Sequence, residues 1–235
     1  MNSLAFVAGA TGYTGAALVA RLRQQGTPTI AHVRPDSPAV ETWRARFEAL
    51  GAEVDTTAWS LDALTARLAS KRPAVVFALL GTTRKRAARE PGATYERVDY
   101  GLTRLLMDAC VAAGCAPRFV YLSALGVGPQ ARGAYLQVRH RMETELRASG
   151  LPWTIARPAF ITGPDRAERR VGERLGATLS QAFFALTDAL GANLDARYGA
   201  MTADQLAQAL VAAGFDNRAA GRVLTRFDLA RQEVQ

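Results

Sequence analysis

Near its N-terminus the chain reads Gly9-Ala10-Thr11-Gly12-Tyr13-Thr14-Gly15, directly after the apolar run 4–8 and directly before residues 16–22, which have helical composition and spacing. This order predicts a strand, a tight glycine turn and a helix. Glycines at such a turn let a pyrophosphate approach the main-chain N–H groups of the helix N-terminus, where the helix dipole favours an anion. The candidate binding residues of the turn are Gly9, Thr11, Gly12, Tyr13, Thr14 and Gly15. The spacing is G-x-x-G-x-x-G rather than G-x-G-x-x-G, so a glycine-rich turn that binds nothing is the alternative.

Apolar runs of strand length alternate with helical segments along the rest of the chain. We expect strands at 29–33, 53–56, 73–80, 119–123 and 152–158, and an edge strand at Val223-Leu224. We expect helices from Ser37 or Pro38 to Leu50, from a Ser60 cap to Lys71, and at 95–113, 134–149, 171–190 and 202–213. Strands separated by helices predict an α/β fold: a doubly wound parallel sheet of the Rossmann type, with a small C-terminal substrate-side extension.

Length and composition set the scale. With 235 residues the chain suits a single domain over 1–235, in which 158–200 is the variable substrate-side segment. No apolar run approaches the roughly 20 residues of a membrane span, so we expect neither an anchor nor a signal peptide. The two cysteines, Cys110 and Cys115, fit reduced thiols in the cytoplasm. They lie far from both histidines in sequence, so no metal site is expected.

The net charge of +8 raises the question of an anionic partner. Most basic residues are scattered through predicted helices, and the one compact cluster is Arg84-Lys85-Arg86 with Arg89 nearby. A phosphorylated cofactor explains this charge more simply than nucleic acid does. A second basic stretch, 166–174, could clamp an acidic substrate, cover the cofactor or simply be solvated.

Arg34 follows the second predicted strand, about 20 residues beyond the glycine turn. In a Rossmann fold this position meets the adenosine ribose: an acidic residue there binds the free 2′-hydroxyl of NAD, whereas an arginine accommodates the 2′-phosphate of NADP. Arg34 therefore predicts NADP(H), although Asp36 lies two residues later. The alternative is an ordinary surface arginine.

Two further strands end in polar or small residues that parallel pairing brings to the same edge as the glycine turn. Leu80, Gly81, Thr82 and Thr83 follow one strand and should lie alongside the cofactor. Ser123 ends the next strand. Tyr135 and Arg139 lie one turn apart on one face of the following helix.

These stretches together resemble the atypical short-chain dehydrogenase/reductases, most closely the NmrA-like branch that includes the Tat-interacting oxidoreductase-like proteins. The stretches are Gly9 to Gly15, Leu80-Gly81-Thr82-Thr83-Arg84, Leu122-Ser123, Tyr135-Leu136-Gln137-Val138-Arg139 and Arg157-Pro158. The resemblance implies a Rossmann fold, NADP(H) binding and a Ser-Tyr-Lys catalytic set. By position, Ser123 would bind the substrate oxygen and Tyr135 would move the proton.

The family's lysine falls on Arg139, which would contact the nicotinamide ribose and keep a positive charge near Tyr135 but cannot release a proton. Many relatives carry a second serine where this chain has Ala124. If Tyr135 and Arg139 have no role in catalysis, they are simply a helix residue and its solvated neighbour. Two functions follow: an NADP(H)-dependent oxidoreductase for a small carbonyl or alcohol substrate, or an NADP(H)-binding redox sensor. Nucleic-acid binding is third, and helices 95–113 and 134–149 offer a surface for a homodimer.

Overall fold

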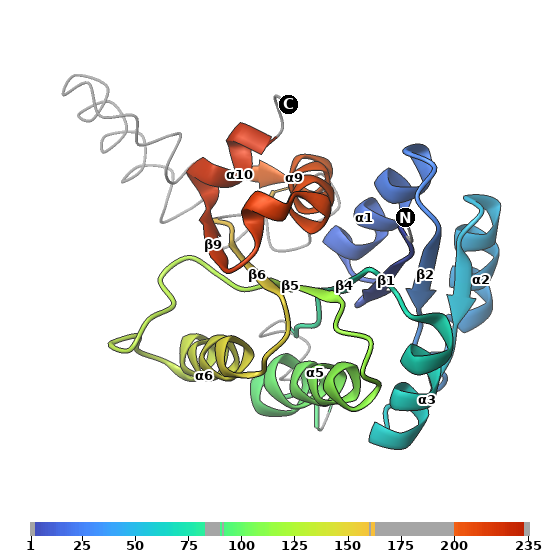
Figure 1. Ribbon diagram of the computed structural model, residues 1–235, viewed down its shortest axis with the longest axis horizontal. Coiled ribbons are helices and arrows are strands. Elements are labelled where there is room, and N and C mark those ends of the chain that lie inside the picture. Colours follow the sequence, from blue (N-terminus) through green and yellow to red (C-terminus); the bar gives the residue numbers. More distant parts are fainter. Residues whose placement is uncertain (1–2, 83–89, 91, 160, 163–199, 233–235) are drawn as a thin grey trace.

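The computed structural model describes residues 3–82, 90, 92–159, 161–162 and 200–232, and a seven-stranded sheet lies at its centre (Figure 1). The strand order is β3-β2-β1-β4-β5-β6-β9, and every neighbouring pair is parallel. The strands are β1 (Ala5–Ala8), β2 (Thr29–His32), β3 (Glu53–Asp55), β4 (Val75–Ala78), β5 (Arg118–Leu122), β6 (Trp153–Arg157) and β9 (Arg222–Thr225). The short strands β7 (Ile161–Thr162) and β8 (Met201–Thr202) pair separately. The predicted doubly wound Rossmann sheet is confirmed.

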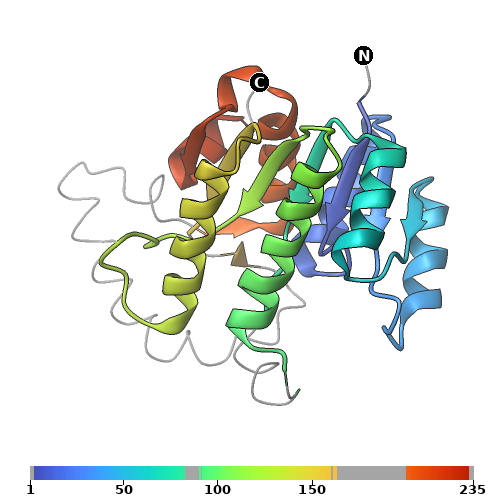
Figure 2. The same ribbon diagram turned by 60° about the horizontal axis from the view of Figure 1, so that its bottom comes forward.

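Helices cover both faces of the sheet (Figures 1 and 2). One face carries α1 (Tyr13–Gln24), α2 (Val40–Ala49) and α9 (Ala203–Phe215), with α10 (Arg226–Gln232) beside α9. The other carries α3 (Leu61–Lys71), the π-helix η1 (Tyr95–Leu102), α5 (Thr103–Ala112) and α6 (Ala134–Ala148). A short 3-10 helix, η2 (Asn217–Ala219), precedes β9. Successive residues of β1 enter opposite cores, which explains why the strand is apolar throughout.

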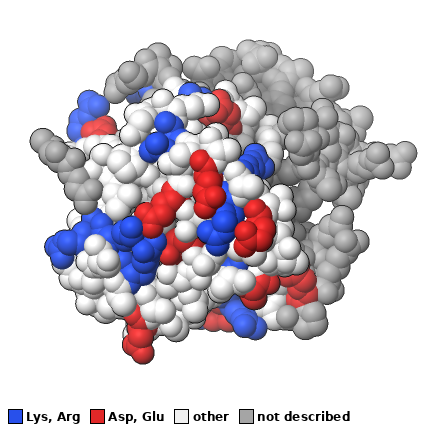
Figure 3. All heavy atoms as spheres, turned by 90° about the vertical axis from the view of Figure 1, so that its right-hand side faces the viewer, with Lys and Arg blue, Asp and Glu red and all other residues white. Residues whose placement is uncertain are grey.

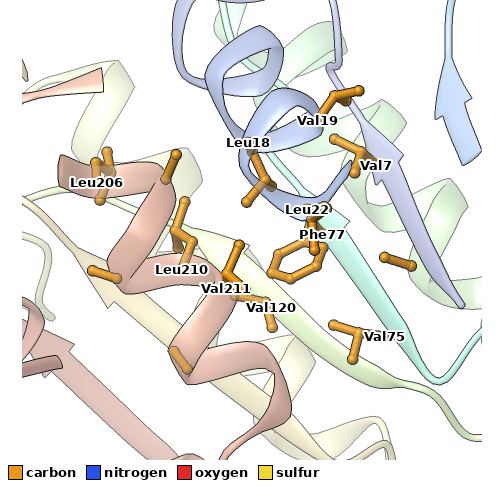
Figure 4. Packing of buried hydrophobic residues seen from close by; sticks show 14 of the residues in the cluster. Val7, Leu18, Val19, Leu22, Val75, Phe77, Val120, Leu206, Leu210 and Val211 are labelled. Carbon is orange, nitrogen blue, oxygen red and sulfur yellow. The ribbon is translucent and has the colours of Figure 1, made fainter. Parts of the chain in front are cut away.

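The largest helix contact is between α1 and α9, which pack together over β1 and β4 (Figure 4). Leu18 and Leu22 of α1 belong to one buried cluster with Leu210 of α9 and Phe77 of β4, and Figure 4 shows these side chains between the two helices and the sheet. A Cβ added at Gly214 would lie 2.6 Å from that ring, so α9 can approach the sheet only with glycine there. Thr202 and Gln205 close the start of α9 as a capping box. This packing fixes the helix that starts at the glycine turn.

Most predicted elements agree with the structure to within a few residues. Val223-Leu224 lies in β9, at the edge of the sheet, as predicted. The helix expected from Ser37 or Pro38 begins at Val40 instead. Residues 34–37 form a turn, in which the Ser37 N–H donates to the Arg34 carbonyl oxygen. Helix α10 was not predicted. The clusters at 84–89 and 166–174, and the helix expected at 171–190, lie outside the described residues.

The prediction of a single α-helix over 95–113 is wrong in its first half. Residues 95–102 form a π-helix, and the α-helix begins at Thr103. Apolar residues spaced three or four apart do not distinguish the two hydrogen-bond patterns over one or two turns. The π-helix matters because π-helical turns are frequent at functional sites.

Charge is mixed on the side of the molecule where the ends of the sheet meet α2 and α3, and Figure 3 shows basic and acidic side chains next to each other there. Glu53, for example, pairs with both Arg67 and Lys71. Of the helices that the structure describes, none is long and apolar enough to cross a membrane.

Candidate functional site

The glycine turn joins β1 to α1 at the carboxyl edge of the sheet. Gly9 has a φ of +83°, and a Cβ there would lie 2.6 Å from the Leu79 carbonyl oxygen of the β4 end. A Cβ at Gly15 would lie 2.1 Å from the Gly9 oxygen. Both positions therefore require glycine for backbone packing. Gly12 is the N-cap of α1 and has no side chain to cap the helix, which suits an anion bound by the first N–H groups of α1.

Three further residues of the turn were predicted to bind the cofactor. Thr11 is half-buried, and Thr14 is buried in the first turn of α1. The Tyr13 hydroxyl donates to the Thr162 carbonyl at 3.3 Å, which joins the turn to β7. The turn therefore contacts the start of the segment 158–200, which the sequence predicts to lie on the substrate side.

A cavity of about 380 Å³ lies beyond the end of β2, where the Rossmann fold receives the adenosine. Arg34 lines it, together with Asp36, whose carboxylate is 3.6 Å from the Arg34 guanidinium. A second arginine, Arg97 of η1, also lines the cavity and comes from the segment that follows β4. A Cβ on Gly92 would lie 2.7 Å from the Arg97 guanidinium. Trp59 and Glu90 contribute to the wall.

No motif or spacing in the sequence points to Arg97. It lies far along the chain from Arg34 and within a segment that was predicted as a plain amphipathic helix. Only the parallel pairing of β1 with β2 and β4 brings the two arginines to one cavity.

The segment after β4 was predicted to lie along the cofactor. In the structure, its polar groups contact buried side chains of η1 and α6. Thr82 donates its backbone N–H to the Asp99 carboxylate at 2.9 Å. A Cβ on Gly81 would lie 3.0 Å from the Arg139 guanidinium and 3.2 Å from the Asp99 carboxylate. Glycine at 81 thus makes room for a buried ion pair. Leu80 is buried, and Thr83 lies outside the described residues.

Arg139 is buried rather than solvated, so its interpretation as a solvent-exposed neighbour of Tyr135 is wrong. Its guanidinium donates to the Asp99 carboxylate at 2.7 Å and to the carbonyls of Leu80 and Leu122. Burial raises the pKa of the Asp99 carboxyl, and the Arg139 charge and the Thr82 N–H oppose that rise. Arg139 therefore crosses the ends of β4 and β5 and is directed into the interior.

Ser123 lies at the end of β5 as predicted, but its hydroxyl is already used. Ser123 Oγ donates to Glu143 Oε1 at 2.6 Å, and Glu143 is completely buried. Arg157 pairs with both carboxylate oxygens of Glu143, at 2.8 and 2.5 Å. A serine hydroxyl has one proton, so in this arrangement Ser123 can accept a hydrogen bond from a substrate but cannot donate one.

Tyr135 is half-buried in the first turn of α6. The Arg139 guanidinium carbon lies 5.1 Å from the centre of its ring, and the Tyr95 ring of η1 lies 5.2 Å away. Tyr135 and Arg139 thus share a face of α6, as their spacing predicted. The arrangement places a positive charge beside the tyrosine ring.

Comparison with known proteins gives the family. A family model described as NAD(P)H-binding matches residues 9–182. The chain belongs to this NAD(P)H-binding family. The match begins at the first glycine of the turn and runs past Ser123, Tyr135 and Arg139. The chain therefore contains an NAD(P)-binding, oxidoreductase-like domain.

Solved structures of NAD(P)-binding proteins share the fold. A short-chain dehydrogenase/reductase superfamily protein from Agrobacterium tumefaciens, solved with bound NAD, aligns with a TM-score of 0.62 at 20% identity, over 94% of this chain and 76% of that one. A Bacillus halodurans protein assigned as an NAD-dependent epimerase/dehydratase aligns with a TM-score of 0.67 at 16% identity, over 98% and 99% of the two chains. These alignments confirm the fold that the resemblance to short-chain dehydrogenase/reductases implied.

A curated relative matches over a shorter stretch. Protein FMP52-1 of Scheffersomyces stipitis, mitochondrial by its name, is 35% identical over 88 residues. That match covers 37% of this chain and 38% of the relative. It supports common ancestry of that stretch.

Proposed function

We propose that this NAD(P)H-binding protein is an NADP(H)-dependent oxidoreductase of the NmrA-like branch, which moves a hydride between the nicotinamide and a small carbonyl or alcohol substrate. The observation that carries the proposal is the cavity beyond β2, which has an arginine on each of two walls. Guanidinium groups bind phosphates through paired N–H donors, so Arg34 and Arg97 together suit the 2′-phosphate that distinguishes NADP from NAD.

Asp36 and Glu90 also line this cavity and would oppose a phosphate. Arg34 and Asp36 are 3.6 Å apart and well exposed, so their pairing is weak and a phosphate dianion can replace it. The balance therefore favours NADP(H), and it can be measured directly.

Cofactor affinity tests this part of the proposal. Titration with NADPH and with NADH, followed by nicotinamide fluorescence, should show NADPH binding about tenfold more tightly, or about 1.4 kcal/mol. Arg34→Asp should narrow or invert that ratio, and Arg97→Gln should narrow it. Arg46→Asp makes the same charge change on α2 outside the cavity and serves as the control. Equal affinities of the unchanged protein for the two cofactors would refute the proposal.

For the chemistry, a bound NADPH would supply the hydride, and Tyr135 would deliver the proton to the substrate oxygen. The Arg139 guanidinium lies beside the Tyr135 ring and so places a positive charge next to the group that would give up the proton. Ser123 would accept a hydrogen bond from a substrate or product hydroxyl. Tyr135 is thus the residue on which proton transfer depends.

Turnover tests this part. Aldehydes, ketones and quinones should be screened for oxidation of NADPH, followed at its absorbance, in the unchanged protein and in Tyr135→Phe. Removing the proton donor should lower kcat about 100-fold or more. Undiminished activity in the Tyr135→Phe variant would exclude the tyrosine from the mechanism.

The second candidate function is an NADP(H)-binding redox sensor with little or no catalysis. The commitment of Ser123 to Glu143 and of Arg139 to Asp99 favours it, since both groups face inward. A sensor would bind NADPH and NADP⁺ with different affinities and reduce no substrate of the screen. The free cysteines Cys110 and Cys115 also lead us to propose a cytoplasmic location. The long helices α5 and α6 lead us to propose a homodimer through their outer faces.

A further inference from the structure

The π-helix η1 carries a carboxylate that is completely removed from solvent. The Asp99 side chain has no exposed surface, and it lies beneath the carboxyl ends of β4 and β5. A buried carboxylate is costly unless it is fully paired, so its partners show what the site requires of it.

The two oxygens of Asp99 have partners on different segments. Oδ2 accepts the Thr82 N–H at 2.9 Å, and Oδ1 accepts from Arg139 at 2.7 Å. Thr82 belongs to the segment that we predict to lie along the cofactor, and Arg139 belongs to the helix of Tyr135. One carboxylate thus joins the cofactor side of the site to its proton-transfer side.

Tyr135 is held from the same π-helix in two ways. Asp99 fixes the guanidinium that lies 5.1 Å from the Tyr135 ring, and Tyr95 places its own ring 5.2 Å from it. Gly81 confirms how closely these groups pack, because a Cβ there would lie 3.0 Å from the Arg139 guanidinium.

We infer that Asp99 is a positioning residue, which couples occupancy of the cofactor site at Thr82 to the placement of Arg139 and Tyr135. This inference rests on the proposed function. A shift of the Thr82 backbone on cofactor binding moves the carboxylate that anchors Arg139. Any displacement of Asp99 weakens its hydrogen bonds to the Thr82 N–H and to the Arg139 guanidinium at the same time. Asn at this position cannot serve both partners, since its amide NH2 would face a donor on one side.

The test compares Asp99→Asn with Glu145→Gln. Glu145 also ties η1 and α5 to α6, through the Tyr100 hydroxyl and Arg104, but on the outer side of the helices and without contact to Thr82. Asp99→Glu is the second variant: it keeps the charge and should fold if the asparagine variant does not. NADPH affinity, kcat and KM are measured at a temperature at which circular dichroism shows each variant folded.

We expect both Asp99 variants to weaken NADPH binding about fivefold or more. At saturating cofactor and substrate they should lower kcat about tenfold or more, because small misplacements of reacting groups are costly. Glu145→Gln should stay within about twofold on both measures. Folded Asp99 variants with unchanged affinity and kcat would overturn the inference, as would equal losses in Glu145→Gln.

The affinity measurement separates this inference from the proposed function. If the unchanged protein binds NADPH but oxidises it with no substrate, the proposed hydride transfer fails, and NADPH affinity still tests Asp99. If Tyr135→Phe abolishes turnover while the Asp99 variants behave as the unchanged protein, the proposed function stands and the inference fails.

Discussion

Replacing Arg139 by methionine should destabilise the fold strongly and in a pH-dependent way. The side chains of the pair are 6% and 0% exposed, so Arg139→Met leaves the Asp99 carboxylate buried without its counter-charge. Breaking such a pair costs about 3–5 kcal/mol. In a chain of this size each kcal/mol lowers Tm by about 2–4 °C, so Tm should fall by about 6–20 °C. Urea denaturation followed by circular dichroism measures the loss at pH 7.

The sign of the pH dependence follows from Asp99. Burial already raises the pKa of its carboxyl despite the opposing Arg139 charge, and without that charge the pKa rises further. A carboxyl whose pKa is higher in the folded state favours folding when it is protonated. This contribution is full below the unfolded pKa of about 3.9 and is lost as the pH rises through the folded pKa. The deficit of Arg139→Met should therefore be smaller at pH 5 than at pH 7.

The double variant Asp99→Asn with Arg139→Met is the control, because it removes both charges. The double variant should regain part of the stability that Arg139→Met loses. Its stability deficit should be the same at pH 5 and at pH 7, because the titrating carboxyl is gone. A loss below about 1 kcal/mol for Arg139→Met at pH 7 would contradict the expected cost of an unpaired buried carboxylate. So would a deficit that is the same at both pH values.

Two further variants probe the turn and the strand ends. Gly15→Ala should lower the free energy of unfolding by about 1–3 kcal/mol, despite the better helix propensity of alanine, because its Cβ would lie 2.1 Å from the Gly9 oxygen. Urea denaturation measures this loss. Gly128→Ala is the control and should be neutral, because no atom lies within 4 Å of the added Cβ. Ser123→Ala should lower kcat/KM less than about tenfold, against about 100-fold or more for Tyr135→Phe, because the serine proton is already donated to Glu143; equal losses in steady-state kinetics would show that Ser123 donates to the substrate.

The backbone of this fold could be predicted from the sequence because its signals are local. The Gly9 to Gly15 turn, the apolar strands and the Ser60 and Thr202 caps each lie within a few residues of the element that they define. Even Val223-Leu224, a weak apolar pair, was predicted as the edge strand β9. Parallel pairing then places every strand end at one edge, which brought Ser123 and the segment after β4 to the glycine turn.

The partners of the site residues could not be predicted, because they lie far apart in the sequence. Ser123 meets Glu143 across 20 residues, and Arg139 meets Asp99 across 40. Arg97 joins Arg34 at one cavity only because β4 returns beside β1. The sequence identified residue types suited to the chemistry, and packing decided which of their hydrogen-bonding groups remain available.

The hydrogen bonds already made by the site residues determine how activity should be measured. Of the three residues that the resemblance assigns to catalysis, Tyr135 is the one whose hydroxyl has no hydrogen-bond partner within the described part of the chain, whereas the Ser123 hydroxyl and the Arg139 guanidinium are held by buried carboxylates. Under the proposed function a substrate oxygen would therefore receive one donor where two are usual, and losing one such donor costs about 10²–10³ in kcat. We therefore expect slow turnover, which a steady-state assay would not distinguish from the absence of turnover in a sensor. Single-turnover oxidation of bound NADPH by an added aldehyde, ketone or quinone, compared between the unchanged protein and Tyr135→Phe, separates the two functions. A slow enzyme shows a decay of NADPH absorbance that the substitution removes, and a sensor shows no decay in either protein.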